Sequence, residues 1–342
     1  MVELNGKKIL VTFLMHLGDL TLTTPFIHAL RKAAPDAHIT MLVDEKLKDV
    51  VLFNPYLDDV VTIDKKGRDN SILSLWACSR HLSKLDFDVL INLHPNERCS
   101  FIDAMTSVKL RTGTTHKIFK WFWDVFTPLD RSMHAADMYL DVLQQLGVQD
   151  LSNNGLEIFP GEEHFLEAEL FWQEQNITDQ DKLIGFNIGS AVPTKRWPPE
   201  RFAEVADIFA AKGYKTVFFG GPMDEEMVAE ATGYMQTRPI IATGHFAIGG
   251  LAAAMRRCCL IITNDSGPMH VAISQKVPIV AMYGPSNPKL YGPYTKDAVI
   301  VTAQPPCQGC ADGMKHSCDD LQCMSRMTVE QVVAAAEKML EK

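Results

Sequence analysis

Short apolar runs that alternate with helix-length amphipathic segments constrain the fold of this chain more than any other feature. In the first half, strand candidates rich in β-branched residues fall at residues 8–14, 38–43, 60–63, 89–93 and 108–112. Helical patterns lie between and after them, at residues 20–34, 47–53, 71–82, 98–106 and 134–145. Continuous apolar strands separated by helices are typical of a parallel sheet that helices cover on both faces.

The alternation restarts after a polar stretch at residues 149–163, so we predict two domains. That stretch contains Asn153, Asn154, Gly155 and Pro160, a composition typical of a domain boundary. Strands then follow at residues 183–187, 216–219, 239–242, 260–264 and 279–283, and helices at 199–212, 224–235, 248–257, 268–275 and 329–340. We expect an α/β fold of two doubly wound, Rossmann-like domains, residues 1–155 and 156–342, which face a central cleft. The last helix, residues 329–340, is free to pack back on the N-terminal domain.

Charge and hydropathy exclude several classes of protein. The net charge of −9 leaves no basic excess for general nucleic-acid binding. No apolar run approaches the roughly 20 residues that cross a bilayer. The apolar start at residues 9–15 is too short for a secretory signal. We therefore expect a cytoplasmic protein.

The loop after the first predicted strand carries a candidate general base. It reads Met15-His16-Leu17-Gly18-Asp19, and no Gly-x-Gly-x-x-Gly follows, so a dehydrogenase is disfavoured. In doubly wound sheets, ligands bind beyond the carboxyl ends of the strands, which is where Asp19 stands. The alternative is that Asp19 only caps the following helix.

Two loops of the second half have the composition of a diphosphate site. Ser190, Lys195 and Arg196 follow the strand at residues 183–187, and the alternative for this segment is a solvated basic loop. Residues 262–270 read Ile-Thr-Asn-Asp-Ser-Gly-Pro-Met-His, where a strand ends and a helix begins. Gly267 allows close backbone approach, and the first amides of such a helix attract anions. Here Asp265 or Ser266 can instead be a helix cap, and His270 a core histidine.

Acidic groups after the strand at residues 216–219 suit a sugar hydroxyl better than a phosphate. Asp224 is the candidate, and the alternative is a first-turn acid that offsets the helix dipole. Asp86-Phe87-Asp88 matches the Asp-x-Asp string of metal-dependent transferases, but it precedes a strand and so belongs to the wrong edge of the sheet. We expect Lys195 and the helix dipole to carry the leaving-group charge without a metal or other cofactor.

Taken together, these motifs resemble glycosyltransferase family 9, the ADP-heptose:lipopolysaccharide heptosyltransferases. The matching segments span nearly the whole chain: Gly18-Asp19 with Thr24-Pro25, Lys195-Arg196-Trp197-Pro198, Asn264 to His270, Tyr283 to Pro288, and the late cysteines. The resemblance implies a GT-B fold with an N-terminal acceptor domain and a C-terminal ADP-sugar domain. It also implies inverting, metal-free transfer of heptose from ADP-L-glycero-D-manno-heptose to a lipid-borne lipopolysaccharide core acceptor.

The resemblance also assigns roles to individual residues. Asp19 is the general base, and Arg98 is an acceptor contact. Donor contacts are Ser190, Lys195, Asp224, Phe246, Asp265, Ser266, Gly267 and His270. Two departures from the family pattern are Ala191, where relatives often carry a second hydroxyl, and the lack of a basic residue near Thr12-Phe13. Competing hypotheses are a related transferase with another nucleotide-sugar, a GT-B epimerase and a non-catalytic nucleotide-sugar-binding protein.

Two further clusters remain open at the level of sequence. Cys307, Cys310, Cys318 and Cys323 include a zinc-type Cys-x-x-Cys pair, but their other spacings are irregular, so reduced thiols are favoured over a structural metal. Residues 115–123, Thr-His-Lys-Ile-Phe-Lys-Trp-Phe-Trp, are the most aromatic stretch. Core packing is the first interpretation. The second is a contact in which Lys117 and Lys120 meet the acceptor or the inner face of the cytoplasmic membrane.

Overall fold

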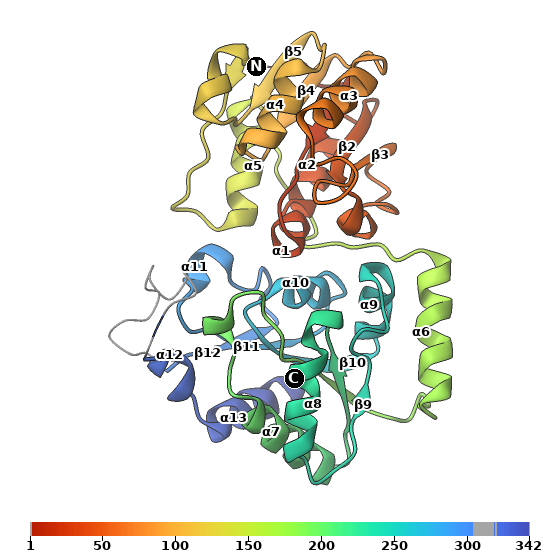
Figure 1. Ribbon diagram of the computed structural model, residues 1–342, viewed down its shortest axis with the longest axis vertical. Coiled ribbons are helices and arrows are strands. Elements are labelled where there is room, and N and C mark those ends of the chain that lie inside the picture. The colour runs from red at the N-terminus through yellow and green to blue at the C-terminus, as the bar shows by residue number, and fades with distance from the viewer. Residues whose placement is uncertain (1, 304–317, 319, 342) are drawn as a thin grey trace. The chain divides into compact units, whose positions relative to one another are not determined.

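The computed structural model describes residues 2–303, 318 and 320–341 (Figure 1). The chain forms two compact units, Met1–Phe159 and Pro160–Lys342. Their boundary, between Phe159 and Pro160, falls inside the polar stretch at residues 149–163. Each unit has its own sheet, and the two are described separately below.

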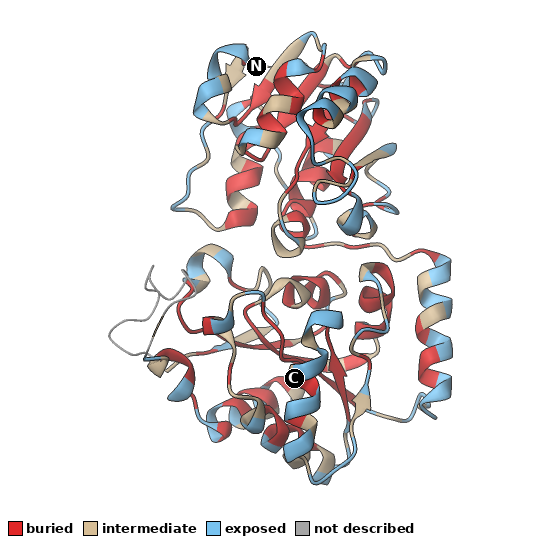
Figure 2. Cartoon of the chain, viewed as in Figure 1, coloured by how far each residue is buried: buried red, intermediate tan, exposed pale blue. Residues whose placement is uncertain are grey.

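The first unit is a six-stranded parallel sheet in the order β3-β2-β1-β4-β5-β6. Its strands are β1 (Lys8–Thr12), β2 (His38–Asp44), β3 (Asp59–Ile63), β4 (Val89–Asn92), β5 (Leu110–Gly113) and β6 (Val125–Phe126). Its helices are α1 (Leu17–Thr21), α2 (Thr24–Ala33), η1 (Glu45–Val50), α3 (Ile72–Ser83), α4 (Glu97–Met105), η2 (Lys117–Phe122) and α5 (Ala135–Gln145). In Figure 2 the central strands are buried, because helices cover both faces of this Val-, Ile- and Leu-rich sheet.

The second unit repeats this plan in the order β12-β11-β10-β7-β8-β9. Its strands are β7 (Leu183–Asn187), β8 (Lys215–Phe219), β9 (Ile240–Ile241), β10 (Cys258–Asn264), β11 (Ile279–Met282) and β12 (Ala298–Val301). The helices that pack on it include α6 (Glu162–Glu174), α7 (Pro199–Ala211), α8 (Glu225–Tyr234), α9 (Ile248–Met255), α10 (Gly267–Ser274) and α13 (Val329–Leu340). Shorter helical turns are η3 (Pro193–Lys195), η4 (Pro222–Asp224), α11 (Pro288–Tyr291) and α12 (Gln322–Ser325).

Local sequence explains where several of these elements begin. Ser71 and Ser74 form a capping box at the start of α3, each side chain 3.1 Å from the other residue's backbone nitrogen. The helix predicted at residues 20–34 is in fact two helices, because α1 ends before Thr23 and Pro25 stands in the first turn of α2. The segment predicted as a helix at residues 47–53 is the 3₁₀ helix η1.

The last helix packs on the sheet of its own unit. Val332, Ala336 and Met339 of α13 are buried in one cluster with residues of α7 and of strands β7, β8, β10 and β11. The indole nitrogen of the fully buried Trp197 donates to the carbonyl of Met327, 3.1 Å away, just before this helix. The buried face of α13 therefore packs within the second unit.

Candidate functional site

Both sheets reverse their strand order next to their first strand. In the second unit the chain adds β8 and β9 on one side of β7, and β10, β11 and β12 on the other. The loops after β7 and β10 therefore leave neighbouring strands at the topological switch point, where open α/β sheets bind ligands. In the first unit the equivalent neighbours are β1 and β4.

Two asparagines at the ends of these strands hold the two loops of the second unit together. The amide nitrogen of Asn187 donates to the hydroxyl of Thr263 (3.2 Å) and to that of Ser266 (2.9 Å). Asn264 donates to the carbonyl of Ile188 (2.7 Å) and accepts from the backbone nitrogen of Trp197 (3.1 Å). Our sequence reasoning gave neither asparagine a role, although Asn264 opens a segment that matches the family and each asparagine ends an otherwise apolar strand.

Lys195 and Asp265 form a nearly buried ion pair across the same two loops. The ammonium nitrogen lies 2.7 Å from the carboxylate oxygen, and the side chains are only 13% and 6% exposed. The hydroxyl of Ser286, in the loop after β11, donates to the same carboxylate oxygen. These contacts hold the Lys195 cation at the carboxyl edge of the sheet.

The start of α10 supplies backbone donors beside this pair. Its cap residue Ser266 is extended and its side chain makes no capping bond, while Gly267 and Pro268 begin the helix. The first amides of a helix have no partner within the helix and favour anions. His270, in the first turn, is 4% exposed. The first amides of α10 thus lie on the loop that carries Asp265, next to the Lys195–Asp265 pair.

Asp224 reaches the loop after β7 from the neighbouring strand. Its carboxylate accepts from the backbone nitrogen of Gly221 (2.9 Å), and it makes no side-chain cap for α8. A β-carbon on Gly189 would lie 2.1 Å from the Asp224 carboxylate. The glycine at position 189 therefore leaves room for the Asp224 carboxylate, which a larger side chain there would displace. This bond closes a capping box at the start of η4, so Asp224 also serves as a first-turn acid, as the helix-start alternative expects.

Phe246 stands in the next loop along this edge. The backbone nitrogen of Gly244 donates to the carbonyl of Gly220 (2.9 Å), which joins the loop after β9 to the loop after β8. The half-buried Phe246 ring meets Phe171 of α6 edge to face, with centroids 5.0 Å apart. The structure thus brings all eight predicted donor residues to one edge of the second sheet.

A cavity of about 490 Å³ lies beside the loop after β7. It is lined by Arg196, Met223, Glu226 and Met324 among others. None of the predicted donor residues lines it. Arg196 itself donates to the carbonyl of Ser190, 2.9 Å away. This hydrogen bond of Arg196 therefore helps to fix the conformation of the loop after β7.

In the first unit, Asp19 lies in α1, directly after β1. The cap residue of this helix is His16, and Asp19 is the third helical residue, so the alternative that Asp19 caps the helix is wrong. Asp19 is half-buried. It follows β1 at the carboxyl edge of the first sheet, next to the switch point between β1 and β4.

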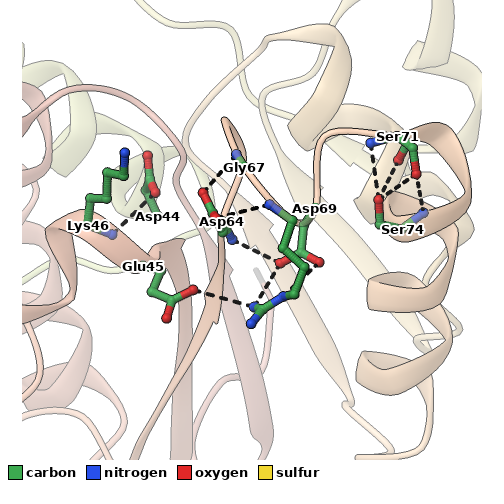
Figure 3. A network of polar contacts seen from close by, with 9 residues as sticks. Asp44, Glu45, Lys46, Asp64, Gly67, Asp69, Ser71 and Ser74 are labelled. Atoms are coloured by element: carbon green, nitrogen blue, oxygen red, sulfur yellow. Dashed lines mark hydrogen bonds and ion pairs between the residues drawn. The ribbon is translucent and has the colours of Figure 1, made fainter.

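Side chains of the loop after β3 form hydrogen bonds with the backbone of the same loop, as Figure 3 shows. The Asp64 carboxylate accepts from the backbone nitrogens of Gly67 (2.9 Å) and Arg68 (3.0 Å), and Asp69 accepts from the backbone of Asp64 (3.0 Å). Hydrogen bonding, first from the Arg68 backbone, lowers the pKa of Asp64. A β-carbon on Gly67 would lie 2.1 Å from the Asp64 carboxylate, so a larger residue here would displace that carboxylate from its hydrogen bonds.

Lys65 joins this loop to the segment that leads into Asp19. Its ammonium nitrogen donates to the carbonyls of Leu14 (2.8 Å) and Met15 (2.9 Å) and lies 3.1 Å from the Asp44 carboxylate. The side chain is only 12% exposed. We did not predict this role, although a lysine just after a strand is the kind of signal that could have indicated it.

Arg98 holds the same loop from α4. Its guanidinium donates to the carbonyl of Lys65 and to the side chain of Asn70, the latter at 2.7 Å. The residue we predicted as an acceptor contact therefore also shapes the loop that carries Lys65.

His94 adds a neutral imidazole at this edge. It follows β4, is 7% exposed and packs against Phe13, with ring centroids 5.6 Å apart. Burial, together with the charges of Lys65 and His16, lowers the pKa of His94 to about 4. The imidazole is therefore uncharged at neutral pH.

The aromatic stretch at residues 115–123 is not a core segment. It forms the 3₁₀ helix η2, in which Lys117 and Lys120 are exposed and Trp121 is 83% exposed. Lys120 lies over the ring of Phe126, 4.4 Å from its centroid. Of the two tryptophans in this stretch, only Trp123 is buried, as core packing would require. It is 8% exposed, and its indole donates to the carbonyl of Thr112 (3.0 Å).

The remaining predicted clusters have the following positions. Asp86 and Asp88 precede β4, as predicted, and Asp88 pairs with Lys109 at 2.6 Å. Cys307 and Cys310 lie outside the described residues, while Cys318 is half-buried and Cys323 buried. Within the described part of the chain, no three His, Cys, Asp or Glu side chains gather as a metal site would require. No helix described combines the length and apolar character that spanning a membrane demands.

Comparison with known proteins agrees with this geometry. The sequence profile described as Glycosyltransferase family 9 (heptosyltransferase) matches residues 75–318. A crystal structure of a family 9 glycosyl transferase from Veillonella parvula is 53% identical, covers 99% of both chains and has a TM-score of 0.95. Lipopolysaccharide heptosyltransferase 3 of Escherichia coli K12 is 25% identical over 94% of this chain and 95% of its own.

A more distant structure shares the fold. The E. coli ADP-heptose lps heptosyltransferase II, 21% identical and covering 98% of each chain, superposes with a TM-score of 0.81. The two parallel sheets and their helices are thus those of the GT-B heptosyltransferase structures. The family 9 profile matches most of this chain, and the family 9 structure from Veillonella parvula is 53% identical to it. We conclude that the chain belongs to glycosyltransferase family 9 and is a glycosyltransferase.

Proposed function

We propose that this enzyme transfers heptose from ADP-L-glycero-D-manno-heptose to an inner-core sugar of lipopolysaccharide, with inversion and without a metal. The observation that carries the proposal is the joined pair of loops after β7 and β10, where Lys195, Asp265 and the start of α10 provide charge and donors for a diphosphate. The names of the relatives supply the sugar and the acceptor. In this proposal the first unit binds the acceptor and the second unit binds the ADP-sugar.

In the proposed mechanism, Asp19 takes the proton from an acceptor hydroxyl as its oxygen bonds to the anomeric carbon. The bond from that carbon to the diphosphate breaks in the same step, and ADP leaves with the electron pair. Lys195 and the α10 amides stabilise the charge on ADP. Positioned proton transfer contributes about 10²–10⁴-fold, and preorganised donors contribute comparably.

The other site residues have binding roles in this proposal. Asp224, held against Gly189, accepts from ribose hydroxyls, and Phe246 flanks the adenine. Ser190, Ser266, Gly267 and His270 contact the diphosphate and heptose. Arg98, Lys117 and Lys120 bind the anionic acceptor, and Lys65 positions the segment that leads into Asp19.

We also propose that the acceptor is presented by a lipid bilayer, so that the protein acts as a peripheral protein at the inner face of the cytoplasmic membrane. The exposed aromatic and basic side chains of η2 support this contact.

The test is incubation with ADP-heptose and a panel of truncated lipopolysaccharides, with and without excess EDTA. Mass spectrometry should detect one added heptose on one truncation, at a rate that EDTA leaves unchanged. Binding of ADP-heptose without transfer to any acceptor would favour a non-catalytic binding protein. A rate that chelation abolishes and magnesium restores would contradict the metal-free mechanism.

A further inference from the structure

Two groups of large apolar side chains lie exposed on the first unit. One is the start of α3, where Ile72, Leu73 and Trp76 are 73%, 78% and 52% exposed. The other is η2, where Ile118, Trp121 and Phe122 are 57%, 83% and 41% exposed. Single exposed apolar residues are ordinary, but gathered ones mark an interaction surface.

The two groups lie on either side of the first turn of α4. On one side, Arg98 donates to Asn70, immediately before α3 and its cap. On the other, the hydroxyl of Ser100 accepts from the backbone of His116 (2.8 Å), and Phe101 meets Phe119 of η2, with centroids 6.4 Å apart. This turn follows β4, so both groups lie at the carboxyl edge of the sheet, the edge that also holds Asp19.

Both segments contain basic side chains and no acidic ones. Neither α3 nor η2 contains an aspartate or glutamate, in a chain whose net charge is −9. Exposed cations accompany the apolar groups: Lys117 and Lys120 in η2, and Arg80, which lies over the ring of Trp76 at 5.9 Å. Glu97 is an exposed acid in the intervening turn, 3.9 Å from His116.

We propose that these six apolar residues, Ile72, Leu73, Trp76, Ile118, Trp121 and Phe122, form one docking surface for an anionic lipid bilayer. Tryptophans settle at headgroup depth with apolar neighbours below them, and nearby lysines and arginines meet lipid phosphates. A symmetric contact with a second copy would instead set these cations against themselves. The inference rests on the proposed lipid-borne acceptor, because docking here brings the acceptor-facing edge of the first unit to the membrane.

The first experiment measures vesicle binding with no sugar present. Wild type should sediment with phosphatidylethanolamine–phosphatidylglycerol vesicles and much less with phosphatidylcholine vesicles. The variant Leu73→Ser/Trp76→Ser/Ile118→Ser/Trp121→Ser should bind at least about tenfold more weakly, since it removes most of the inserted apolar area. Lys117→Glu/Lys120→Glu should lose about fivefold or more for each lysine.

A matched control is Leu166→Ser/Leu170→Ser on α6, which removes side chains that are 60% and 50% exposed in the other unit. This control should bind vesicles like wild type. Size-exclusion chromatography and thermal melts of every variant accompany the binding assay. Absence of wild-type binding, or a wild-type dimer that the fourfold serine variant dissociates, would overturn the proposal.

The second experiment separates docking from chemistry. Transfer is measured to a delipidated, water-soluble core acceptor and to the same acceptor embedded in vesicles. The fourfold serine variant should keep the wild-type rate on the soluble acceptor and lose tenfold or more on the embedded one. Equal loss on both acceptors would overturn the docking role. If wild type binds vesicles as expected but never transfers heptose to either acceptor, the docking surface stands and the proposed function fails.

Discussion

Replacing Lys195 by methionine separates the charge of this residue from its structural role. Its partner Asp265 is 6% exposed, so Lys195→Met leaves a buried carboxylate without its cation, beside the hydroxyls of Ser286 and Tyr283. Breaking a buried pair from one side costs about 3–5 kcal/mol of unfolding free energy. That is a large part of the roughly 5–15 kcal/mol that stabilises a typical domain, so the melting temperature should fall clearly.

Lys195→Met should also lower turnover by about 10²–10³-fold, because it removes the cation that we propose stabilises the charge on the departing ADP. The decisive variant is Lys195→Met/Asp265→Asn. It removes both charges, and the asparagine oxygen can still accept from Ser286, so most of the lost stability should return while turnover stays low. Urea denaturation and an ADP-release assay on the same preparations measure the two quantities. Recovery of turnover together with stability would show that Lys195 serves only to pair Asp265.

Two other predictions concern residues that shape the two sites, and a third concerns Asp103, a buried residue of α4 that accepts from the hydroxyl of Thr12 (2.8 Å). Lys65→Met should lower kcat about tenfold or more with an unchanged KM for the donor, because it loosens the segment before Asp19; an equal effect on ADP affinity would refute this positioning role. Gly189→Ala should weaken ADP binding in calorimetry, because the new methyl displaces Asp224, and affinity equal to wild type would place Asp224 outside the donor site. Burial raises the pKa of Asp103 to about 8, so the unfolded chain releases this proton first and the unfolding free energy falls from about pH 4 to pH 8. In urea titrations across this pH range, the unfolding free energy of Asp103→Asn should fall less than that of wild type. The difference is at most on the order of 5 kcal/mol, and an equal fall in the two proteins would contradict the prediction.

Much of the fold follows from local apolar periodicity. Every strand predicted in the two halves exists within about two residues, because a sheet buried on both faces requires continuous apolar runs. The missed strands, β6 and β12, lie at sheet edges and are only partly buried, so they lack that pattern. The missed helix α6 buries only Ala168, Phe171 and Trp172, and it follows the polar stretch that we interpreted as a boundary.

The candidate site was predictable in its composition but not in its pairing. Loops after strands were the right places to search, since the topology gathers them at one edge. Sequence spacing does not show that Lys195 meets Asp265, 70 residues away, or that Asn187 and Asn264 brace each other's loops. The role of Lys65 likewise depends on a contact about 50 residues back along the chain, which only the folded sheet creates.

The measurement that tests the central claim most directly is the turnover of Asp19→Asn beside its affinity for ADP. Both are measured against wild type, with ADP-heptose and the lipopolysaccharide truncation that accepts heptose. Because the substitution keeps the shape of the side chain and removes only the base, we expect unchanged ADP affinity and a turnover lower by about 10²-fold or more. Wild-type turnover in Asp19→Asn, or no heptose transfer by the wild-type enzyme to any truncation, would contradict the account.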